Sequence, residues 1–395
     1  MKVAYVVQRY GPEIRGGAET HCRAFAEHLA HRGYDVHVYT TCAIDYRTWH
    51  NAFPPGTTTE AGVTVHRYKV AEGRSPEFDQ ASAEILPNPQ RVPRDRQEEW
   101  MNMQGPRSPE LVKALRAESG QFDLVIFVTY LYYTTYFGLP EAGDHAVLHP
   151  TAHDEPPIHL PIFDDMFQIP KGFVFLTDEE RRLVHRRFDI SAAEVVTGTG
   201  IEPPTQVDET IARSKLGLTN PYVLYLGRID PSKGMDHLLA FFSTYRARTQ
   251  YPVELVLAGD GADKVAEMDG IRMIGALDDE EKWSVLAGAE VLIHPSYYES
   301  FAMNLLEAWC VGTPAVVNAH CDVTVGHCRR ANAGVWYRSY AEFESCLDHL
   351  LADASLRRAL GAQGREYVHS LYQWNDVIDR YLHFLESVVA ASSAV

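Results

Sequence analysis

The hydrophobic and polar positions of the chain follow two alternating patterns. Short, nearly continuous apolar runs bounded by glycine, proline or polar residues predict buried parallel strands, because helices cover both faces of such a sheet. Between these runs, apolar residues spaced three and four positions apart predict amphipathic helices. The predicted strands span residues 2–8, 36–41, 63–70, 124–128, 146–150, 172–176, 222–226, 253–258, 271–274, 291–296 and 315–318. Strands that alternate with helices in this way indicate an α/β protein with doubly wound parallel sheets.

The alternation occurs twice, and a polar stretch separates the two series. Residues 198–217, which include two adjacent prolines, predict a linker between domains. Two domains also agree with a length of 395 residues, which exceeds the usual size of one hydrophobic core. Residues 45–110 are rich in proline, glycine and charge, so we expect long loops there around the strand at 63–70. Such loops either select substrates or are insertions without a function of their own, and their role stays open.

Charge and composition limit the partners. The formal net charge is -17 and the isoelectric point is about 5.5, so the surface repels nucleic acid and anionic lipid, and we expect no nucleic-acid partner. The six cysteines show no CxxC spacing, no signal segment precedes the first strand, and no apolar run approaches the ~20 residues that span a bilayer. We therefore expect a cytoplasmic protein without a transmembrane segment. A peripheral membrane contact and the oligomeric state stay open.

One strand–loop–helix unit, residues 291–314, carries two glutamates. Glu299 falls in the loop after the strand, and Glu307 lies in the helix that we expect from about Phe301. Eight residues of helix rise about 12 Å, which is similar to the length of a sugar, a diphosphate and a ribose laid end to end. The first helical amides between the two carboxylates form an anion site. A surface helix with one glutamate near each end is an equally good interpretation of this unit alone.

Two cations follow the first strand of the second series. Arg228 and Lys233 are five positions apart and have glycines on both sides, which suits a diphosphate, because arginine can bind oxygens as a fork and lysine adds a point charge. The alternative is a pair of ordinary surface cations. In a parallel sheet, however, this loop and the Glu299 loop both open at the carboxyl ends of the strands, where such folds bind ligands.

Two features of the first half could also bind ligands. Gly16 and Gly17 open the first helix, where glycine lets a backbone come close to a ligand, although a tight packing turn explains them about as well. His153 begins a His-Asp-Glu cluster after the strand at 146–150, at the carboxyl edge of the predicted sheet. A structural loop histidine is the alternative.

Together, these motifs resemble glycosyltransferase family 4, the retaining nucleotide-sugar transferases of GT-B fold. The resemblance implies an α/β fold with two doubly wound, Rossmann-like domains that face a central cleft. It implies an acceptor-side domain over residues 1–200, a nucleotide-sugar-binding domain over 201–375, and a final helix, 376–395, that packs back toward the first domain. Residues 45–110 and 154–171 are not covered. The matching motifs are Gly16-Gly17-Ala18-Glu19, Gly227-Arg228, Lys233-Gly234, Ala258-Gly259-Asp260-Gly261, His294-Pro295-Ser296, and Glu299 through Glu307 with Ala308, Gly312, Thr313 and Pro314.

The resemblance also implies a role for each matching residue. Arg228 and Lys233 would bind the diphosphate, Glu299 the sugar hydroxyls and Glu307 the ribose. Ile274 would border the base, and His153 would lie near the anomeric carbon. The implied catalytic residues are Glu299, His153, Arg228 and Lys233, and the implied donor-binding residues are Gly16, Gly17, Arg228, Lys233, Ile274, Glu299, Phe301, Ala302, Met303, Asn304, Leu305 and Glu307.

The sequence departs from the family pattern at three places. Ala302 stands where the family commonly has glycine, which puts the closest approach of the sugar in doubt. Thr199 replaces a common asparagine, and the family's glycine-rich loop after the strand at 315–318 is replaced by Ala319-His320-Cys321-Asp322. The nearby residues His320, Cys321, His327 and Cys328 lack the spacing of known zinc modules, so we expect no metal site.

The implied reaction is transfer of a sugar with retention from a nucleotide-diphosphate donor of UDP or GDP type to a hydroxyl acceptor, which could be a glycan, a lipid-linked compound or a small molecule. A nucleoside diphosphate is a good leaving group, so charge stabilisation by cations and helix amides suffices, and we expect neither a metal nor another cofactor. The main alternative is a sugar-nucleotide epimerase that uses His153, Asp154 and Glu155 as acid and base. A non-catalytic nucleotide-sugar binding protein is a second alternative.

Overall fold

A computed structural model of the protein describes residues 1–14, 16–261 and 268–393. Arg15, in the predicted loop before the first helix, lies outside the described residues. The chain forms two compact units, Met1–Thr199 together with Val377–Val395, and Gly200–Asp376. Each unit contains a largely or wholly parallel sheet with covering helices, so the predicted α/β class is confirmed.

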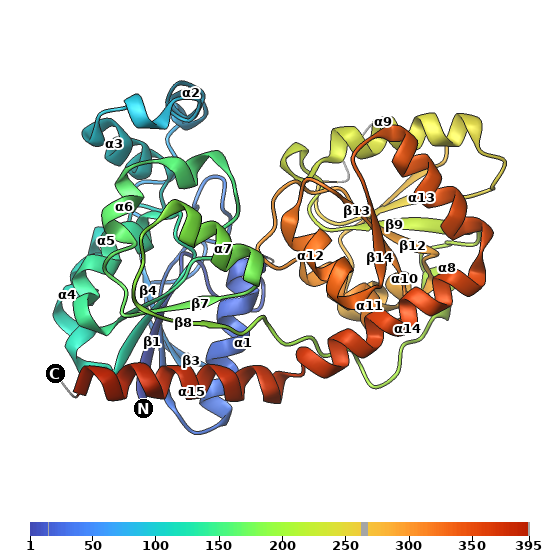
Figure 1. The fold of residues 1–395 in the computed structure, drawn as a ribbon. Coiled ribbons are helices and arrows are strands. Elements are labelled where there is room, and N and C mark those ends of the chain that lie inside the picture. Colours follow the sequence, from blue (N-terminus) through green and yellow to red (C-terminus); the bar gives the residue numbers. More distant parts are fainter. Residues whose placement is uncertain (15, 262–267, 394–395) are drawn as a thin grey trace. The chain divides into compact units, whose positions relative to one another are not determined.

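The first unit is built on an eight-stranded sheet with helices on both faces (Figure 1). Its strand order is β3-β4-β2-β1-β5-β6-β7-β8, and the pairings are parallel except between β3 and β4. The chain order reverses between β1 and β5, and the crevice beside such a switch point is where open α/β sheets bind ligands. The strands are β1 (Lys2–Val6), β2 (Asp35–Thr41), β3 (Gly56–Glu60), β4 (Val63–Tyr68), β5 (Leu124–Val128), β6 (Ala146–His149), β7 (Gly172–Phe175) and β8 (Ala193–Val196).

The helices of the first unit bury alternate residues of the strands. Ala4 and Val6 belong to the same core cluster as Leu111 and Leu115, whereas the Tyr5 hydroxyl lies 3.0 Å from that of Tyr381 on the final helix. The helices are α1 (Gly17–His31), α2 (Phe78–Ile85), α3 (Arg94–Gln104), α4 (Pro109–Glu118), α5 (Tyr133–Ala142), α6 (Ile162–Met166), α7 (Asp178–Arg187) and, from Val377 onward, α15 (Trp374–Ser393). Short 3-10 turns are η1 (Pro89–Arg91), η2 (Ser119–Gln121), η3 (Gly143–His145) and η4 (Pro156–His159).

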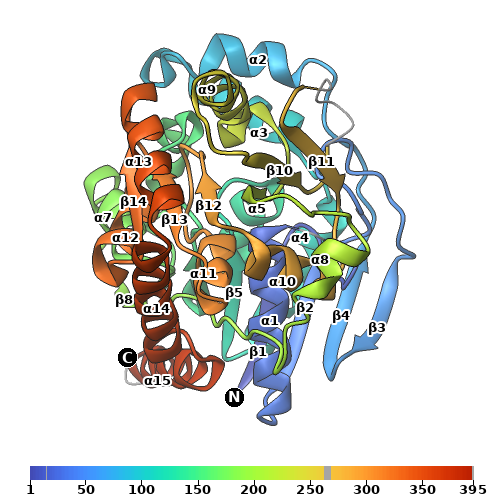
Figure 2. The same ribbon diagram turned by 90° about the vertical axis from the view of Figure 1, so that its right-hand side faces the viewer.

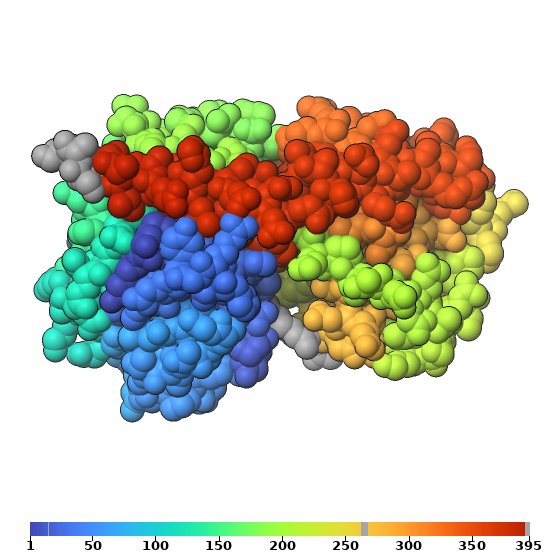
Figure 3. All heavy atoms as spheres, turned by 90° about the horizontal axis from the view of Figure 1, so that it is seen from below, coloured from blue at the N-terminus to red at the C-terminus, as the bar shows by residue number. Residues whose placement is uncertain are grey.

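The final helix belongs to the first unit for most of its length. Figure 3 shows this red helix lying along the blue N-terminal segment of the unit. Its Tyr381 hydroxyl also lies 3.1 Å from Nε2 of the buried His149, at the end of β6. At the surface, Tyr34 donates a hydrogen bond to Glu386 over 3.3 Å, and Arg32 pairs with Asp379. Buried and exposed contacts together therefore attach the helix to the N-terminal sheet.

The second unit is built on a six-stranded, wholly parallel sheet, which Figure 2 shows with β11 and β14 at its opposite edges. The strand order is β11-β10-β9-β12-β13-β14, so the switch point lies between β9 and β12. The strands are β9 (Tyr222–Leu226), β10 (Glu254–Ala258), β11 (Ile271–Gly275), β12 (Val291–His294), β13 (Ala315–Asn318) and β14 (Gly334–Tyr337).

Local signals place the helices of the second unit. The Asp278 side chain accepts the Glu281 amide while the Glu281 side chain accepts that of Asp278, a capping box that starts α10. Asp353 accepts two amides of the first turn of α14. The helices are α8 (Thr210–Ser214), α9 (Met235–Arg248), α10 (Asp279–Gly288), α11 (Met303–Cys310), α12 (Asp322–Ala331), α13 (Tyr340–Ala352) and α14 (Ala354–Leu371), and the 3-10 turn η5 spans Pro231–Lys233.

Two sequence predictions are wrong in detail. The long loops expected over residues 45–110 contain β3, α2 and α3. The strand β3 reads GTTTE with four exposed positions, α2 is only eight residues long with two buried side chains, and α3 is mostly polar, so each gives a weak signal in the sequence. The predicted linker contains α8, whose Ala212 amide donates to the Ser284 hydroxyl over 2.9 Å. That contact packs part of the stretch against α10 instead of leaving it extended between domains.

Candidate active site

The loops after β9 and β12 meet at the switch point of the second sheet. Lys233 ends the turn η5 in the first loop, and Glu299 lies in the second. Lys233 Nζ donates a hydrogen bond to Glu299 Oε1 over 2.7 Å, and both side chains are largely buried. The structure therefore brings together the cation and the carboxylate that the sequence placed in separate motifs.

A glycine makes this approach possible. Gly234 follows Lys233 with a φ of 76°, in the left-handed region, and a Cβ there would lie 2.3 Å from the carbonyl oxygen of Pro295. Only glycine combines this backbone conformation with such close backbone contact. The loop after β9 therefore lies directly against the loop after β12, with Lys233 at the junction.

Glu299 is held in its ionised form. Burial alone would raise its pKa, but Lys233, His294 and a hydrogen bond from the Ser296 hydroxyl lower the pKa to about 2. The nearest histidine atom, His294 Nε2, lies 3.8 Å from Glu299 Oε1. An ionised carboxylate accepts hydrogen bonds without donating any, which suits it to bind hydroxyl groups.

Asn304 fixes the tautomer of His294. Asn304 Nδ2 donates to the Leu226 carbonyl oxygen over 2.5 Å, which leaves its Oδ1 to accept from His294 Nε2 over 3.1 Å. The imidazole therefore carries its proton on Nε2, and its buried Nδ1 has no partner among the described residues. Burial lowers the pKa of His294, and the neighbouring Glu299 carboxylate opposes this shift. The sequence motifs placed Asn304 among the donor-binding residues but gave no signal for this side-chain bridge.

Glu307 has its own cation. Lys282 of α10 donates to Glu307 Oε1 over 2.9 Å and lies 4.9 Å from the ring centroid of Trp283. Burial opposes the charge on Lys282, but Glu307 and Asp279 raise its pKa. The sequence offered no signal for Lys282, because it belongs to an acidic helix start far from the motifs. Glu299 lies in the loop and Glu307 in the helix, as predicted, and the helix begins at Met303 where about Phe301 was expected, so the rise of about 12 Å for eight helical residues does not describe the whole stretch between the two glutamates.

The start of α11 has an unusual backbone. Ala302 is its N-cap residue, with φ 64° and ψ 62°, the left-handed conformation that favours the glycine expected here. Ala302 is nearly buried, as are Phe301 and Leu305, while Met303 and Asn304 are half-buried. The Leu305 amide donates to the Ala302 carbonyl over 3.0 Å and is thus engaged within its own turn.

Arg228 and Ile274 lie on the same half of the second sheet. Arg228 is exposed after β9, and its carbonyl oxygen accepts the Tyr225 hydroxyl over 2.6 Å. Ile274 is half-buried near the end of β11. The turn beyond it is tied to the next loop by a 2.7 Å bond from the Gly259 amide to the Gly275 carbonyl.

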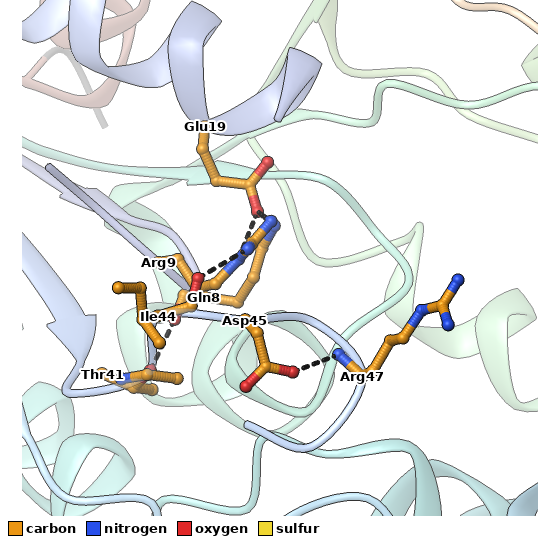
Figure 4. A network of polar contacts seen from close by, with 8 residues as sticks. Gln8, Arg9, Glu19, Thr41, Ile44, Asp45 and Arg47 are labelled. Carbon is orange, nitrogen blue, oxygen red and sulfur yellow. Dashed lines mark hydrogen bonds and ion pairs between the residues drawn. The ribbon is translucent and has the colours of Figure 1, made fainter. Parts of the chain in front are cut away.

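The paired glycines of the first unit lie beside a buried ion pair, shown in Figure 4. Arg9 Nη2 lies 2.6 Å from Glu19 Oε1, and Gln8 donates to the same oxygen over 2.9 Å. A Cβ on Gly16, the N-cap residue of α1, would lie 2.2 Å from Glu19 Oε2, so a side chain there would displace the carboxylate. A Cβ on Gly17 would meet nothing within 4 Å. The Arg9–Glu19 pair was not predicted.

His153 lies beyond β6, within a supported loop. Its Nδ1 is 3.5 Å from Glu155 Oε1, and that oxygen accepts a hydrogen bond from the Tyr130 hydroxyl over 2.9 Å. The buried Glu180 accepts the Ala152 amide over 2.7 Å; burial raises the pKa of Glu180 to about 8 in spite of its amide hydrogen bonds. The neighbouring Thr151 has a φ of 48°, which is uncommon outside glycine. These contacts fix the backbone on which His153 stands.

The described residues contain a hollow, but neither a metal-binding cluster nor a helix that could span a membrane. In residues 1–14, 16–261 and 268–393, no three histidine, cysteine, aspartate or glutamate side chains are grouped so as to hold a metal ion. A hollow of about 830 Å³ lies between the ends of α9 and α13, lined by Arg248, Tyr251 and Asp348 among others. It adjoins the amino end of β10, the edge opposite to Lys233. No helix within those same ranges has the length and apolar character needed to cross a membrane.

Comparison with known proteins agrees with the expected resemblance. Residues 206–367 match the family model of glycosyl transferases group 1. The chain is 28% identical over 247 residues to the MMP alpha-(1->4)-mannosyltransferase of Mycolicibacterium hassiacum, which covers 56% of this chain and 59% of that protein. It is 31% identical over 235 residues to the phosphatidyl-myo-inositol mannosyltransferase of Mycolicibacterium smegmatis, covering 57% and 59%. The chain thus spans less than two thirds of these relatives.

Solved structures show the same fold over nearly the whole chain. Sucrose-phosphate synthase from Thermosynechococcus elongatus matches with a TM-score of 0.75 at 18% identity and covers 99% of both chains. Anabaena HepE, in complex with UDP and glucose, matches with a TM-score of 0.69 at 14% identity and covers 98% of this chain and 100% of the other. The GT-B fold expected from the motifs, with its two Rossmann-like domains, is therefore confirmed.

Proposed function

We propose that this chain, whose residues 206–367 match the group 1 glycosyl transferases, moves a sugar from a nucleotide-diphosphate donor to a hydroxyl acceptor with retention of the anomeric configuration. The observation that carries the proposal is the Lys233–Glu299 pair at the β9/β12 switch point. A cation suited to phosphate and a carboxylate suited to hydroxyl groups meet there in one hydrogen bond, at the edge where parallel sheets bind ligands, and this supports the proposed roles.

The donor would lie along this edge in the order sugar, diphosphate, nucleoside. The ionised Glu299 accepts sugar hydroxyls, and Lys233 with Arg228 binds the diphosphate. Glu307, oriented by Lys282, accepts the ribose hydroxyls, and Ile274 borders the base. The amides from Phe301 to Asn304 would donate hydrogen bonds to sugar and phosphate oxygens. The Leu305 amide already donates to the Ala302 carbonyl, so Leu305 would act by holding the turn in place. Gly16 and Gly17 would approach the donor phosphate from the first unit.

The reaction needs charge stabilisation more than acid catalysis. As the anomeric bond breaks, negative charge collects on the diphosphate, and Lys233, Arg228 and the first amides of α11 stabilise it. The acceptor hydroxyl enters on the face of the leaving group, which retains the configuration. His153, on a loop held by Glu180 and Glu155, would lie near the anomeric carbon. In this mechanism no metal ion is required, since the protein's own cations supply the charge.

The names of the similar proteins support a hexose as the sugar of the donor. Two relatives are named as mannosyltransferases, and one structure of the same fold contains UDP and glucose. A hexose carried by UDP or GDP is therefore the donor class that we propose. Two of these proteins are named as mannosyltransferases and a third as a synthase, so the epimerase alternative is not favoured.

A donor panel tests the proposal. Purified protein would be incubated with UDP- and GDP-hexoses, with and without EDTA, and hydrolysis of each donor would be followed together with thermal stabilisation. We expect one donor to be hydrolysed slowly in the absence of acceptor, undiminished by EDTA, with an α-configured product from an α-linked donor. Inversion at the anomeric carbon, or the release of an epimerised nucleotide sugar, would contradict the proposal.

A further inference from the structure

The first unit contains a cation that the proposed donor site does not use. Arg74 lies in the loop after β4 and is half-buried. Within the part of the chain that the structure describes, its guanidinium forms no ion pair and its buried Nε–H has no acceptor. Buried N–H groups in folded proteins nearly always have an acceptor. The Nε–H of Arg74 is therefore available to donate to a bound group.

Aromatic rings hold Arg74 in place. Its guanidinium carbon lies 4.8 Å from the ring centroid of Phe78 and 6.0 Å from that of Trp49. Trp49 in turn packs edge-on against Tyr132, with centroids 5.3 Å apart, and donates its indole N–H to the Gln104 carbonyl over 2.7 Å. Rings on this side stabilise the cation by cation–π attraction but accept no guanidinium hydrogen bond in the plane of its fork.

These residues come from loops at one edge of the sheet. Arg74 follows β4, Trp49 follows β2 and Tyr132 follows β5, so each loop leaves the carboxyl end of a parallel strand. The loops are tightly joined: a Cβ on Gly73 would lie 2.2 Å from the Thr48 carbonyl oxygen. This edge is where α/β sheets bind ligands, and the joined loops hold Arg74 in a fixed position there.

The surrounding charges leave Arg74 without compensation. Burial lowers the pKa of Arg74, which the charge of Asp79 opposes without forming an ion pair with it among the described residues. Asp45 accepts the amides of Arg47 and Thr48 over 2.8 and 2.6 Å, so it is engaged within its own loop. Figure 4 shows the Arg47 side chain extending away from Asp45, and Arg9 turned to Glu19.

We propose that Arg74 binds an oxyanion, a phosphate or a carboxylate, carried by the acceptor. This inference rests on the proposed transferase function, because the donor occupies the other sheet's switch point and leaves this edge to the second substrate. With a net charge of -17, the protein surface repels anions in general. An anion would therefore bind where an unpaired guanidinium lies at a ligand-binding edge, and not elsewhere on the surface. The planar fork of arginine fits both oxyanions with two parallel hydrogen bonds. The side chains of Tyr46 and Tyr132 beside it would pack against the acceptor's ring.

Calorimetric titration tests this proposal without any donor sugar. The probes are glucose 6-phosphate, glycerol 3-phosphate and glucuronate, each compared with neutral glucose or glycerol, in the presence and absence of excess UDP or GDP. We expect saturable binding of at least one anionic probe, with its neutral counterpart at least about tenfold weaker, and no competition by the nucleotide. The phosphate and carboxylate probes decide which oxyanion the site takes.

Variants assign the binding to Arg74. Arg74→Met keeps much of the aliphatic stem on the aromatic rings and should weaken the anionic probe at least about tenfold, while Arg74→Lys should give an intermediate loss. The matched control is Arg107→Ala on a neighbouring segment, because Arg107 already has Glu72 as a partner at 2.7 Å. Circular dichroism and melting temperature show whether each variant is folded.

Three results would overturn the inference: no saturable binding of any anionic probe, unchanged affinity in folded Arg74→Met protein, or displacement of the probe by nucleotide. The titration uses no sugar donor, so it can fail while transfer activity stands. The donor panel can likewise fail while the anion still binds.

Discussion

Lys233 Nζ donates a 2.7 Å hydrogen bond to Glu299 Oε1, although 66 positions separate the two residues along the chain. The contact joins the loops on either side of the reversal in strand order, and Gly234 permits their approach. In the proposed complex, Lys233 would also contact the diphosphate, and Glu299 would accept hydrogen bonds from the sugar hydroxyls. The pair thus holds both groups in position before the donor arrives, which reduces the ordering that binding requires.

Gly234 should tolerate no side chain. In Gly234→Ala, the left-handed backbone and the contact with the Pro295 carbonyl should together cost more than about 2 kcal/mol of unfolding free energy. Gly120→Ala is the matched control, because a Cβ there would meet nothing within 4 Å. Urea denaturation of both variants measures the difference. Equal stabilities would show that the loop after β9 adapts without strain.

Replacement of Ala302 by glycine should increase the stability of the protein. An L-residue in the left-handed conformation costs about 1–2 kcal/mol, and glycine loses about 0.5–1 kcal/mol more entropy on folding, so Ala302→Gly should gain roughly 0.5 kcal/mol of stability. Removal of the Cβ should also open the first amides of α11 to the sugar and lower the KM for the donor. A clear loss of stability would instead show that the methyl group fills a needed place in the core.

Glu307 should recognise the ribose specifically. Glu307→Gln, and Lys282→Met through the loss of its 2.9 Å contact, should weaken binding of the donor's nucleoside diphosphate about tenfold, because a ribose hydrogen bond to a charged group is lost. Both variants should bind pyrophosphate as the wild type does. Calorimetry with the two ligands separates ribose contacts from phosphate contacts, and a parallel loss for pyrophosphate would contradict the assignment.

Buried histidines should make the first unit sensitive to acid. Burial lowers the pKa of His21 to about 3, and burial, with a smaller contribution from His21, lowers the pKa of His149 well below its usual value. Both therefore stay neutral in the fold when the unfolded chain, with a pKa of about 6.5, takes up protons. Stability should fall by about 1.4 kcal/mol per histidine for each pH unit below that pKa, down to about pH 3 for His21. The His21→Gln variant should show a shallower dependence of unfolding free energy on pH. An unchanged dependence would show that His21 is hydrated in the folded protein.

The main strands could be predicted because their burial has a simple cause. A central parallel strand is covered on both faces, as in β5 (LVIFV), where all five residues are buried, so the sequence shows an uninterrupted apolar run. The edge strand β3 is exposed along four of its five residues and has no such signal. Helix α2 is only eight residues long and α3 is mostly polar, and each buries only a few side chains, which explains why they were taken for loops.

The candidate site could be predicted only as separate motifs. Glycine spacing and position after a strand identified Lys233 and Glu299, since those signals are local. The partners of Glu307 and Glu19 could not be found this way, because Lys282 and Arg9 come from other elements and meet them only after folding. The same holds for Arg74, whose significance lies in the absence of a carboxylate partner among the described residues.

The most direct measurement of the central claim compares Glu299→Ala with wild type on the donor that the panel identifies. Donor turnover and nucleoside diphosphate affinity would be measured together, with Glu290→Gln as control, since Glu290 pairs with Arg357 elsewhere in the second unit. We predict that Glu299→Ala loses transfer by at least about a hundredfold while nucleotide affinity changes little, and that Lys233→Met loses nucleotide affinity as well. Unchanged turnover in folded Glu299→Ala protein would contradict the account.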